Sequence, residues 1–165
     1  TKMSGTRAAG VDGWRARELK CLPVLLLEPG AQLYELIEDE GLENVFARHR
    51  RIATGVRHVV KAWGLELCAV SPDVYSDTVS AIKTPDGFNA TDIVTRAADK
   101  YGMAFGVGLG EVAGKVFRIG HLGMLTDAMM LSGLGVAEMV MVDLGLGIKL
   151  GSGVAAAQEV YRHGV

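Results

Sequence analysis

The chain has 165 residues, and its 17 Lys and Arg against 19 Asp and Glu give a formal net charge of −2. This length suits one domain with its own hydrophobic core, and the near-balanced charge argues against a nucleic-acid partner. The longest apolar run, residues 22–27, is interrupted by Pro23 and is too short to cross a bilayer. No charged start followed by an apolar core and a cleavage site is recognisable, so we expect a cytoplasmic protein without a membrane partner.

The cysteine spacing and the hydropathy lead to two further expectations. Cys21 and Cys68 show no Cys-x-x-Cys spacing, so we expect reduced thiols and no bound metal. Hydrophobic residues make up 49% of the chain, and the mean hydropathy is +0.25. This is apolar for a small domain that stands alone, so exposed apolar surface is expected to meet another copy of the chain or another domain. We therefore predict a homo-oligomer.

The first part of the chain carries little periodic signal. Residues 1–30 have no hydrophobic period, and two prolines interrupt their apolar stretch, so we predict an irregular N-terminal arm. Residues 31–165 are predicted to form the folded domain. A short helical turn is expected around 33–37, followed by a break at Glu38–Gly41.

A long helix is expected from about Leu42 to Trp63, because apolar residues recur there with a period near 3.6. The residues predicted to face the core are Val45, Ile52, Val56, Val59 and Trp63. The opposite side is basic, but no aromatic residues interleave with its charges, so we interpret it as a solvated face rather than a phosphate-binding surface. Its basic residues are Arg48, Arg50, Arg51, Arg57 and Lys61.

Strands are predicted at residues 65–70 and 77–83, and a turn follows at Pro85–Gly87. Asn89 is predicted to cap a helix over residues 90–101, and Gly102 to end it.

The second half adds two predicted strands, 103–109 and 115–119, then a helix over 124–143 and a tail helix over 151–163. The order of elements predicts an α+β fold in which helices cover a small antiparallel or mixed sheet. The two glycines inside the long helix would each cost about 1 kcal/mol unless a neighbour packs closely. The residues of that helix expected to point inward are Leu125, Met129, Val136 and Val140.

Arg118 is the main candidate for chemistry. It stands in an apolar strand that ends in glycines, and its guanidinium offers a planar fork of donors that matches a carboxylate. The alternative is that Arg118 lies at an edge and pairs with a structural Asp or Glu. The strand pattern leaves both interpretations open.

Other motifs carry less weight. Residues 110–115 resemble a phosphate-binding loop, but the spacing is one residue short and Val116 replaces the required Ser or Thr. The glycine patterns at 108–113 and 151–156 are interpreted as turns, because neither has the context of a dinucleotide-binding unit. His49 and His58 would lie on opposite sides of a helix, so they predict no metal site.

Several segments resemble the C-terminal small domain of serine–glyoxylate (alanine–glyoxylate) aminotransferases, class V pyridoxal-phosphate-dependent transaminases of fold type I. They recur in the right order and with compatible spacing, and together they span about Ala31 to Arg162. The segments that carry the resemblance are 41–50, 56–57, 62–68, 75–81, 113–123 and 151–158.

In that family the arginine of the Arg-Ile-Gly motif binds the carboxylate of the substrate. The resemblance therefore assigns substrate-carboxylate binding to Arg118, with Gly120 and His121 as neighbours of the site. It assigns no catalytic, cofactor-binding or metal-binding residue. Met124 departs from the polar residue expected at the start of the last long helix.

The family's large domain, with the lysine that binds pyridoxal phosphate, should lie upstream of the matched segment. Residues 1–30 do not resemble it, and no lysine in the matched segment stands at the cofactor position. We therefore expect no bound pyridoxal phosphate, and a truncated transferase-like protein that binds small carboxylates through Arg118 without transaminating alone. The alternatives are a stand-alone enzyme that uses Arg118 and His121 on small carboxylates or amino acids, and a binding or regulatory module that docks on another protein.

Overall fold

The computed structural model describes residues 37–163, and the chain divides into two compact units, 1–45 and 46–165. The arm predicted for residues 1–30 and nearly all of the turn predicted around 33–37 lie outside the described residues. Residues 37–40 are helical, and Gly41 separates them from helix α3, Leu42–Ala62. Gly41 has a φ of 79°, a backbone conformation that suits glycine. The predicted break and long helix are confirmed.

A four-stranded antiparallel sheet forms one layer of the second unit, with the strand order β1-β2-β4-β3. The long central pair is β2, Val79–Lys83, and β4, Val116–Gly120, and their register places Ala81 opposite Arg118. The edge strands are β1, Glu66–Leu67, and β3, Gly106–Val107. Together with the helices, this sheet confirms the predicted α+β fold.

The two edge strands are much shorter than the predicted strands 65–70 and 103–109. After β1, the Cys68 N–H still donates to the Ala81 carbonyl oxygen at 2.8 Å, and the chain then leaves the sheet and enters a 3-10 turn, η2 (Pro72–Val74). Beyond β3, Gly108 passes so close to the chain that an added Cβ would lie 2.2 Å from the Val112 carbonyl oxygen. The turn η3, Gly110–Val112, therefore displaces further strand pairing.

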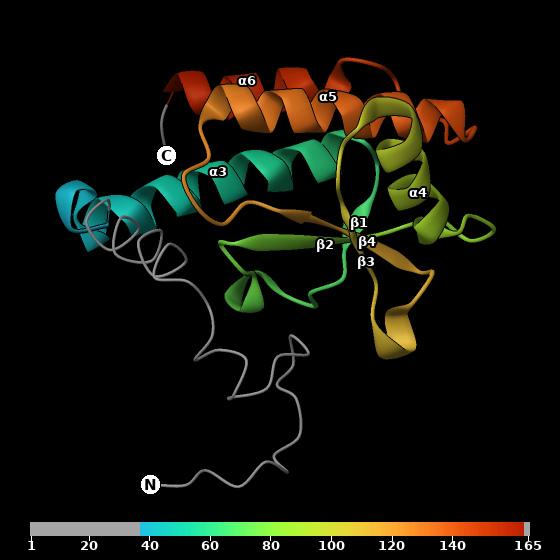
Figure 1. Cartoon of the computed structure of the whole chain (residues 1–165), viewed down its shortest axis with the longest axis horizontal. Helices are drawn as coiled ribbons and strands as arrows, with labels where there is room; N and C mark the ends of the chain where they lie inside the picture. The colour runs from blue at the N-terminus through green and yellow to red at the C-terminus, as the bar shows by residue number, and fades with distance from the viewer. Residues whose placement is uncertain (1–36, 164–165) are drawn as a thin grey trace, which may run out of the picture. The chain divides into compact units, whose positions relative to one another are not determined.

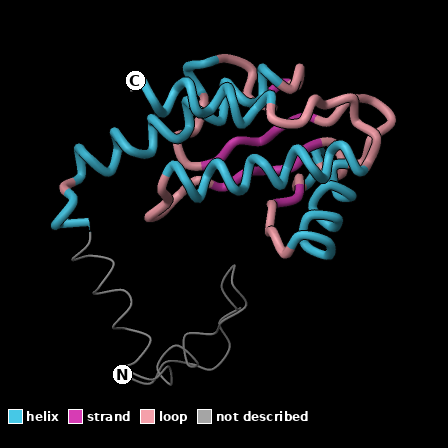
Figure 2. The backbone as a smooth tube through the Cα atoms, turned by 90° about the horizontal axis from the view of Figure 1, so that it is seen from above, coloured by secondary structure: helices cyan, strands magenta, loops and turns pink. Residues whose placement is uncertain are grey.

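The α-helices lie on one side of the sheet (Figure 1), and in the view from above the strands run behind them (Figure 2). Ile82, Phe117 and Ile119 point to this side and are buried in the core. Because side chains alternate along a strand, Arg118 and Gly120 project from the opposite face, which no described α-helix covers. The helices after α3 are α4, Ala90–Tyr101; α5, Asp127–Asp143; and α6, Ser152–His163.

Helix α4 matches its prediction at both ends. The Asn89 side chain accepts a hydrogen bond of 3.0 Å from the Thr91 N–H, which satisfies a donor of the first turn. Gly102 ends the helix in the left-handed conformation, with a φ of 64°.

Helices α3 and α6 approach closely through a glycine on each. A Cβ on Gly55 of α3 would lie 2.4 Å from the ring of Tyr161 in α6, and a Cβ on Gly153 of α6 would lie 2.4 Å from Trp63 Nε1. Gly55 thus provides the space for Tyr161 of α6, and Gly153 provides the space for Trp63, the residue that follows α3. These contacts depend on the absence of a side chain at both positions.

The prediction for α5 was wrong about the residue at which the helix begins and about one of the side chains that face the core. The helix begins at Asp127, three residues later than predicted, because Thr126 caps it by accepting from the Met129 N–H. Met129 was expected to point inward but is 55% exposed, whereas Met130 is buried. The helix is apolar around most of its circumference, so spacing alone does not select the buried side. The residues fully enclosed are Met130, Leu134, Ala137, Glu138, Val140 and Met141.

Candidate functional site

Arg118 lies half-buried on the face of the sheet that no described α-helix covers. Its neighbour in the register of β3 is Gly106, where an added Cβ would lie 3.2 Å from Arg118 Cβ and 3.1 Å from Nε. The missing side chain lets the arginine lie across β3. There its Nε–H donates a hydrogen bond of 2.9 Å to the Val107 carbonyl oxygen.

This contact holds the guanidinium and leaves its outer nitrogens without a hydrogen bond to the residues that the structure describes. No carboxylate within residues 37–163 forms an ion pair with Arg118. A guanidinium oriented in this way can accept a carboxylate through two parallel N–H donors. The described residues therefore offer no Asp or Glu partner for the structural ion pair, which was one of the two interpretations of Arg118.

The two other predicted site residues fall on different sides of the sheet. Gly120 is exposed on the same face as Arg118, two residues further along β4. His121 follows the end of β4 and is fully buried, at 0% exposure. Its Nε2 lies 3.0 Å from the hydroxyl of Ser80, which is itself a buried residue on the helix-facing side of β2. The structure therefore brings Gly120 but not His121 to the face that carries Arg118.

His121 has the bonding pattern of a neutral structural histidine. Its Nδ1 lies 3.1 Å from the Asp77 carbonyl oxygen, which can only accept, so Nδ1 carries the proton and Nε2 accepts from Ser80. Burial lowers the pKa of His121 from 6.5 to about 4, against the opposing effect of the Asp77 carbonyl. At neutral pH this imidazole is uncharged. Because it lies on the other face from Arg118, the alternative enzyme that would use both residues gains no support from their geometry.

The basic side of α3 is not simply a solvated face: the expectation was wrong for Arg51 and Arg57, whereas Arg50 is 69% exposed. Arg51 forms a two-pronged ion pair with Asp127, with N–O distances of 2.7 and 2.5 Å. Asp77 receives both Arg57, at 2.5 Å, and Arg50, at 3.6 Å. The aspartates stand far along the chain, before β2 and in the first turn of α5, so the helix pattern alone contains no signal for them.

Glu138 is the polar residue that sequence reasoning missed. It is 2% exposed, and its Oε1 accepts from the indole N–H of Trp63 at 2.9 Å and from the Gly153 N–H at 2.6 Å. Its Oε2 accepts from the Gly151 N–H at 2.6 Å. This carboxylate fills the N-terminus of α6, the position of the glycine pattern at 151–156. The sequence signal that could have identified Glu138 is that it is a single charged residue in the interior of an apolar helix, where a buried charge needs partners.

The described lysines are either ion-paired or exposed, and three of the helix N-termini are occupied by side-chain oxygens. Lys83 pairs with Glu66 at 3.4 Å, and Lys100 pairs with Asp143 at 2.7 Å, which raises the pKa of Lys100. The other lysines, Lys61, Lys115 and Lys149, are exposed. Asn89, Thr126 and Glu138 occupy the N-termini of α4, α5 and α6 with oxygen acceptors.

Comparison with known proteins gives the relatives of this fold. The chain is 72% identical over 128 residues to an L-aspartate–glyoxylate aminotransferase of Paracoccus denitrificans and 55% identical over 127 residues to a serine–glyoxylate aminotransferase of Hyphomicrobium methylovorum. These matches cover 78% and 77% of the chain. The chain matches a fragment of a class V aminotransferase. It spans about a third of the length of these curated relatives, 32% and 31%.

Solved structures agree with this assignment of the class V aminotransferase fragment. Pyridoxamine–pyruvate aminotransferase of Mesorhizobium loti superposes with a TM-score of 0.74 at 35% identity, over 78% of this chain and 33% of that one. Ureidoglycine–glyoxylate aminotransferase of Bacillus subtilis superposes with a TM-score of 0.73 at 29% identity, and the match covers 78% of this chain and 33% of that one. No family model matches the chain. Within residues 37–163, no helix is long and apolar enough to cross a membrane.

Proposed function

We propose that this chain provides the substrate-carboxylate-binding part of a glyoxylate aminotransferase, with Arg118 as the residue that binds the carboxylate. The curated relatives named above carry glyoxylate aminotransferase names, and glyoxylate and amino-acid substrates share one carboxylate next to the reacting carbon. An enzyme of this class must hold that group while chemistry occurs at the adjacent atom.

One observation carries the proposal: Arg118 is held by Val107 on a face that no described α-helix covers, and it pairs with no described carboxylate. A half-buried arginine that is ordered by one hydrogen bond loses little side-chain entropy when a ligand binds. Its planar donors also give a carboxylate a defined orientation, which a lysine ammonium would not.

The second part of the proposal is that these 165 residues do not transaminate alone. Pyridoxal phosphate needs a lysine for covalent attachment and a cradle for its phosphate. The described residues do not fit it, because Lys83 and Lys100 are ion-paired, the other described lysines are exposed, and side-chain oxygens fill the N-termini of α4, α5 and α6. We therefore assign this chain binding and orientation of the carboxylate and no step of the cofactor's chemistry.

Glyoxylate titrations followed by NMR of the arginine Nε–H signals test the first part. We expect the Arg118 signal to shift in a saturable way, and Arg118→Lys to weaken binding about tenfold, because the planar fork is lost. Arg96→Lys, at an exposed position on α4, is the matched control and should leave binding unchanged. Equal binding by Arg118→Lys and the unaltered protein would refute the role of Arg118.

Borohydride reduction after incubation with pyridoxal phosphate tests the second part. We expect mass spectrometry to find only scattered, substoichiometric lysine adducts. A single lysine labelled one-to-one, together with amino-group transfer to glyoxylate, would contradict the proposal.

A further inference from the structure

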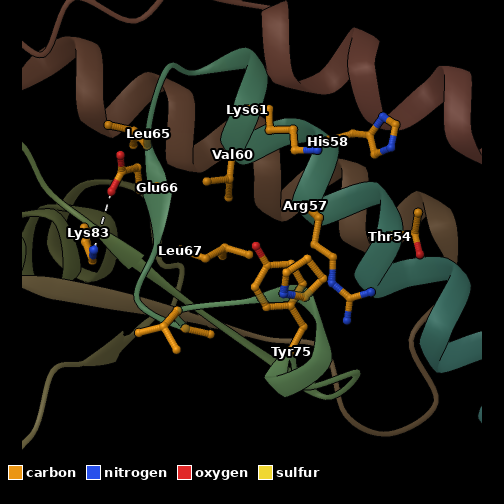
Figure 3. Close-up of a pocket in the computed structure, with 13 residues that line it drawn as sticks. Thr54, Arg57, His58, Val60, Lys61, Leu65, Glu66, Leu67, Tyr75 and Lys83 are labelled. Carbon is orange, nitrogen blue, oxygen red and sulfur yellow. Dashed lines mark hydrogen bonds and ion pairs between the residues drawn. The ribbon is translucent and has the colours of Figure 1, made fainter.

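A cavity of about 700 Å³ lies between the C-terminal half of α3 and the segment 65–75, beside edge strand β1 (Figure 3). Its volume is within the range of small-molecule sites. Arg57, His58 and Lys61 line it from α3, and Lys83 lines it from β2. Neither Arg118 nor any other residue of β4 contributes to it.

The cations of this cavity are not equally available. Arg57 pairs with Asp77 at 2.5 Å, a carboxylate that Arg50 also approaches at 3.6 Å, and Lys83 pairs with Glu66 at 3.4 Å. Among the lysines and arginines that line the cavity, Lys61 is the one that forms no ion pair within the described part of the chain. One cation without an ion pair suits a monoanion better than a dianion.

Arg57 also keeps donors for a ligand. Its Nη2 bonds to Ser76 and Asp77, and its guanidinium lies 5.3 Å from the centroid of the Tyr75 ring. These contacts hold the group still and leave Nε and Nη1 without a partner among residues 37–163. A fixed guanidinium and an ammonium without an ion pair that line the same cavity offer a carboxylate two kinds of cationic donor.

The remaining wall of the cavity is apolar. Val60 and Leu67 line it from α3 and β1, and Leu67 points toward Tyr75 in the close-up view (Figure 3). Val70, also part of the lining, is 94% exposed. Covering such a side chain with an apolar group is favourable, because it removes apolar surface from water. A ligand of this cavity therefore gains from a hydrocarbon body as well as from a negative head.

We propose that this cavity binds a small aliphatic monocarboxylate, whose head contacts Lys61, His58 and Arg57 and whose hydrocarbon body covers Leu67 and Val70. The site is separate from the carboxylate site proposed at Arg118, and the two differ in what they select. Arg118 would bind the short head common to oxo acids and amino acids, whereas the cavity requires an apolar chain.

Hexanoate is the probe, and binding is followed by amide NMR. We expect saturable shifts at the amides of Leu67 and Tyr75, and none with hexan-1-ol at the same concentrations, because the neutral alcohol lacks the charged head. Lys61→Gln should weaken hexanoate binding about tenfold through loss of a charged hydrogen bond. Lys149→Gln, at an exposed position outside the cavity, should not change it.

Two further variants separate this site from its alternatives. Val70→Asp places a negative charge on the apolar wall without disturbing the core, and should also weaken hexanoate binding. Arg118→Gln should leave hexanoate binding intact even where glyoxylate binding is lost. The proposal is overturned if Lys61→Gln binds hexanoate normally, if hexan-1-ol binds equally well, or if Arg118→Gln abolishes hexanoate binding.

Discussion

The indole N–H of Trp63 donates a hydrogen bond of 2.9 Å to Oε1 of Glu138, and so connects the residue after α3 to the middle of α5. The same carboxylate accepts from Gly151 and Gly153, so one buried side chain joins α3, α5 and α6. A buried carboxylate with this many donors is stabilising only while the donors remain.

Glu138→Gln tests this connection. The amide keeps one acceptor oxygen and adds an NH₂ that faces other donors, so at least one N–H loses its partner. We expect a loss of about 2–3 kcal/mol in the free energy of unfolding, measured by urea denaturation followed by circular dichroism. Glu159→Gln, at an exposed ion pair, is the control and should change stability by less than about 0.5 kcal/mol. Equal stabilities for the two variants would show that the Glu138 contacts contribute little.

Two helix glycines should respond in opposite ways to alanine. Gly55→Ala places a Cβ 2.4 Å from the Tyr161 ring, so the helices must separate, and we expect a loss of about 3 kcal/mol or more. Gly133→Ala meets nothing within 4 Å and should gain about 0.5–1 kcal/mol from helix propensity. Thermal unfolding of both variants measures the difference. A destabilised Gly133→Ala would show that this side of α5 is covered by something other than the described residues.

His121 should make stability depend on pH in mildly acidic solution. Because burial lowers its folded pKa to about 4 from 6.5, the unfolded chain binds the proton first. Its contribution is therefore complete above about pH 6.5 and is lost as the pH falls toward 4, by about 3 kcal/mol in all.

Urea denaturation between pH 4 and 7 measures this effect. In the His121→Gln variant the free energy of unfolding should change less with pH than in the unaltered protein, although the variant is also less stable at neutral pH. His163→Gln, which replaces an exposed histidine, should keep the slope. An unchanged slope in His121→Gln would assign the pH dependence to other groups.

The ion pair of Arg51 and Asp127 should be stronger than an ordinary surface pair. Its geometry is two-pronged and both side chains are about two-thirds covered, with 32% and 34% exposure. A double-mutant cycle with Arg51→Gln and Asp127→Asn is expected to give a coupling of about 1–2 kcal/mol. The cycle for Arg162 and Glu159, exposed at 68% and 63%, should give no more than about 0.5 kcal/mol. Similar couplings for the two pairs would contradict the importance of the geometry.

Local sequence signals predicted the elements whose ends depend on nearby residues. Asn89 and Gly102 bound α4 because a cap and a left-handed glycine act within one turn. The edge strands and the buried side of α5 were less predictable. Gly108 stops β3 by approaching Val112, and α5 is apolar on several sides, so distant packing decides which of Met129 and Met130 is enclosed.

For the candidate site, the sequence by itself determined that an arginine stands in an apolar strand before glycines, and its resemblance to glyoxylate aminotransferases assigned Arg118 a carboxylate. Only the tertiary structure decided which residues share a face. The alternation of β4 places Arg118 and Gly120 together and directs His121 into the helix layer, where Ser80 and Asp77 hold it. Partners such as Ser80, Asp77 and Glu138 are distant along the chain, and folding alone brings them to the groups that they bind.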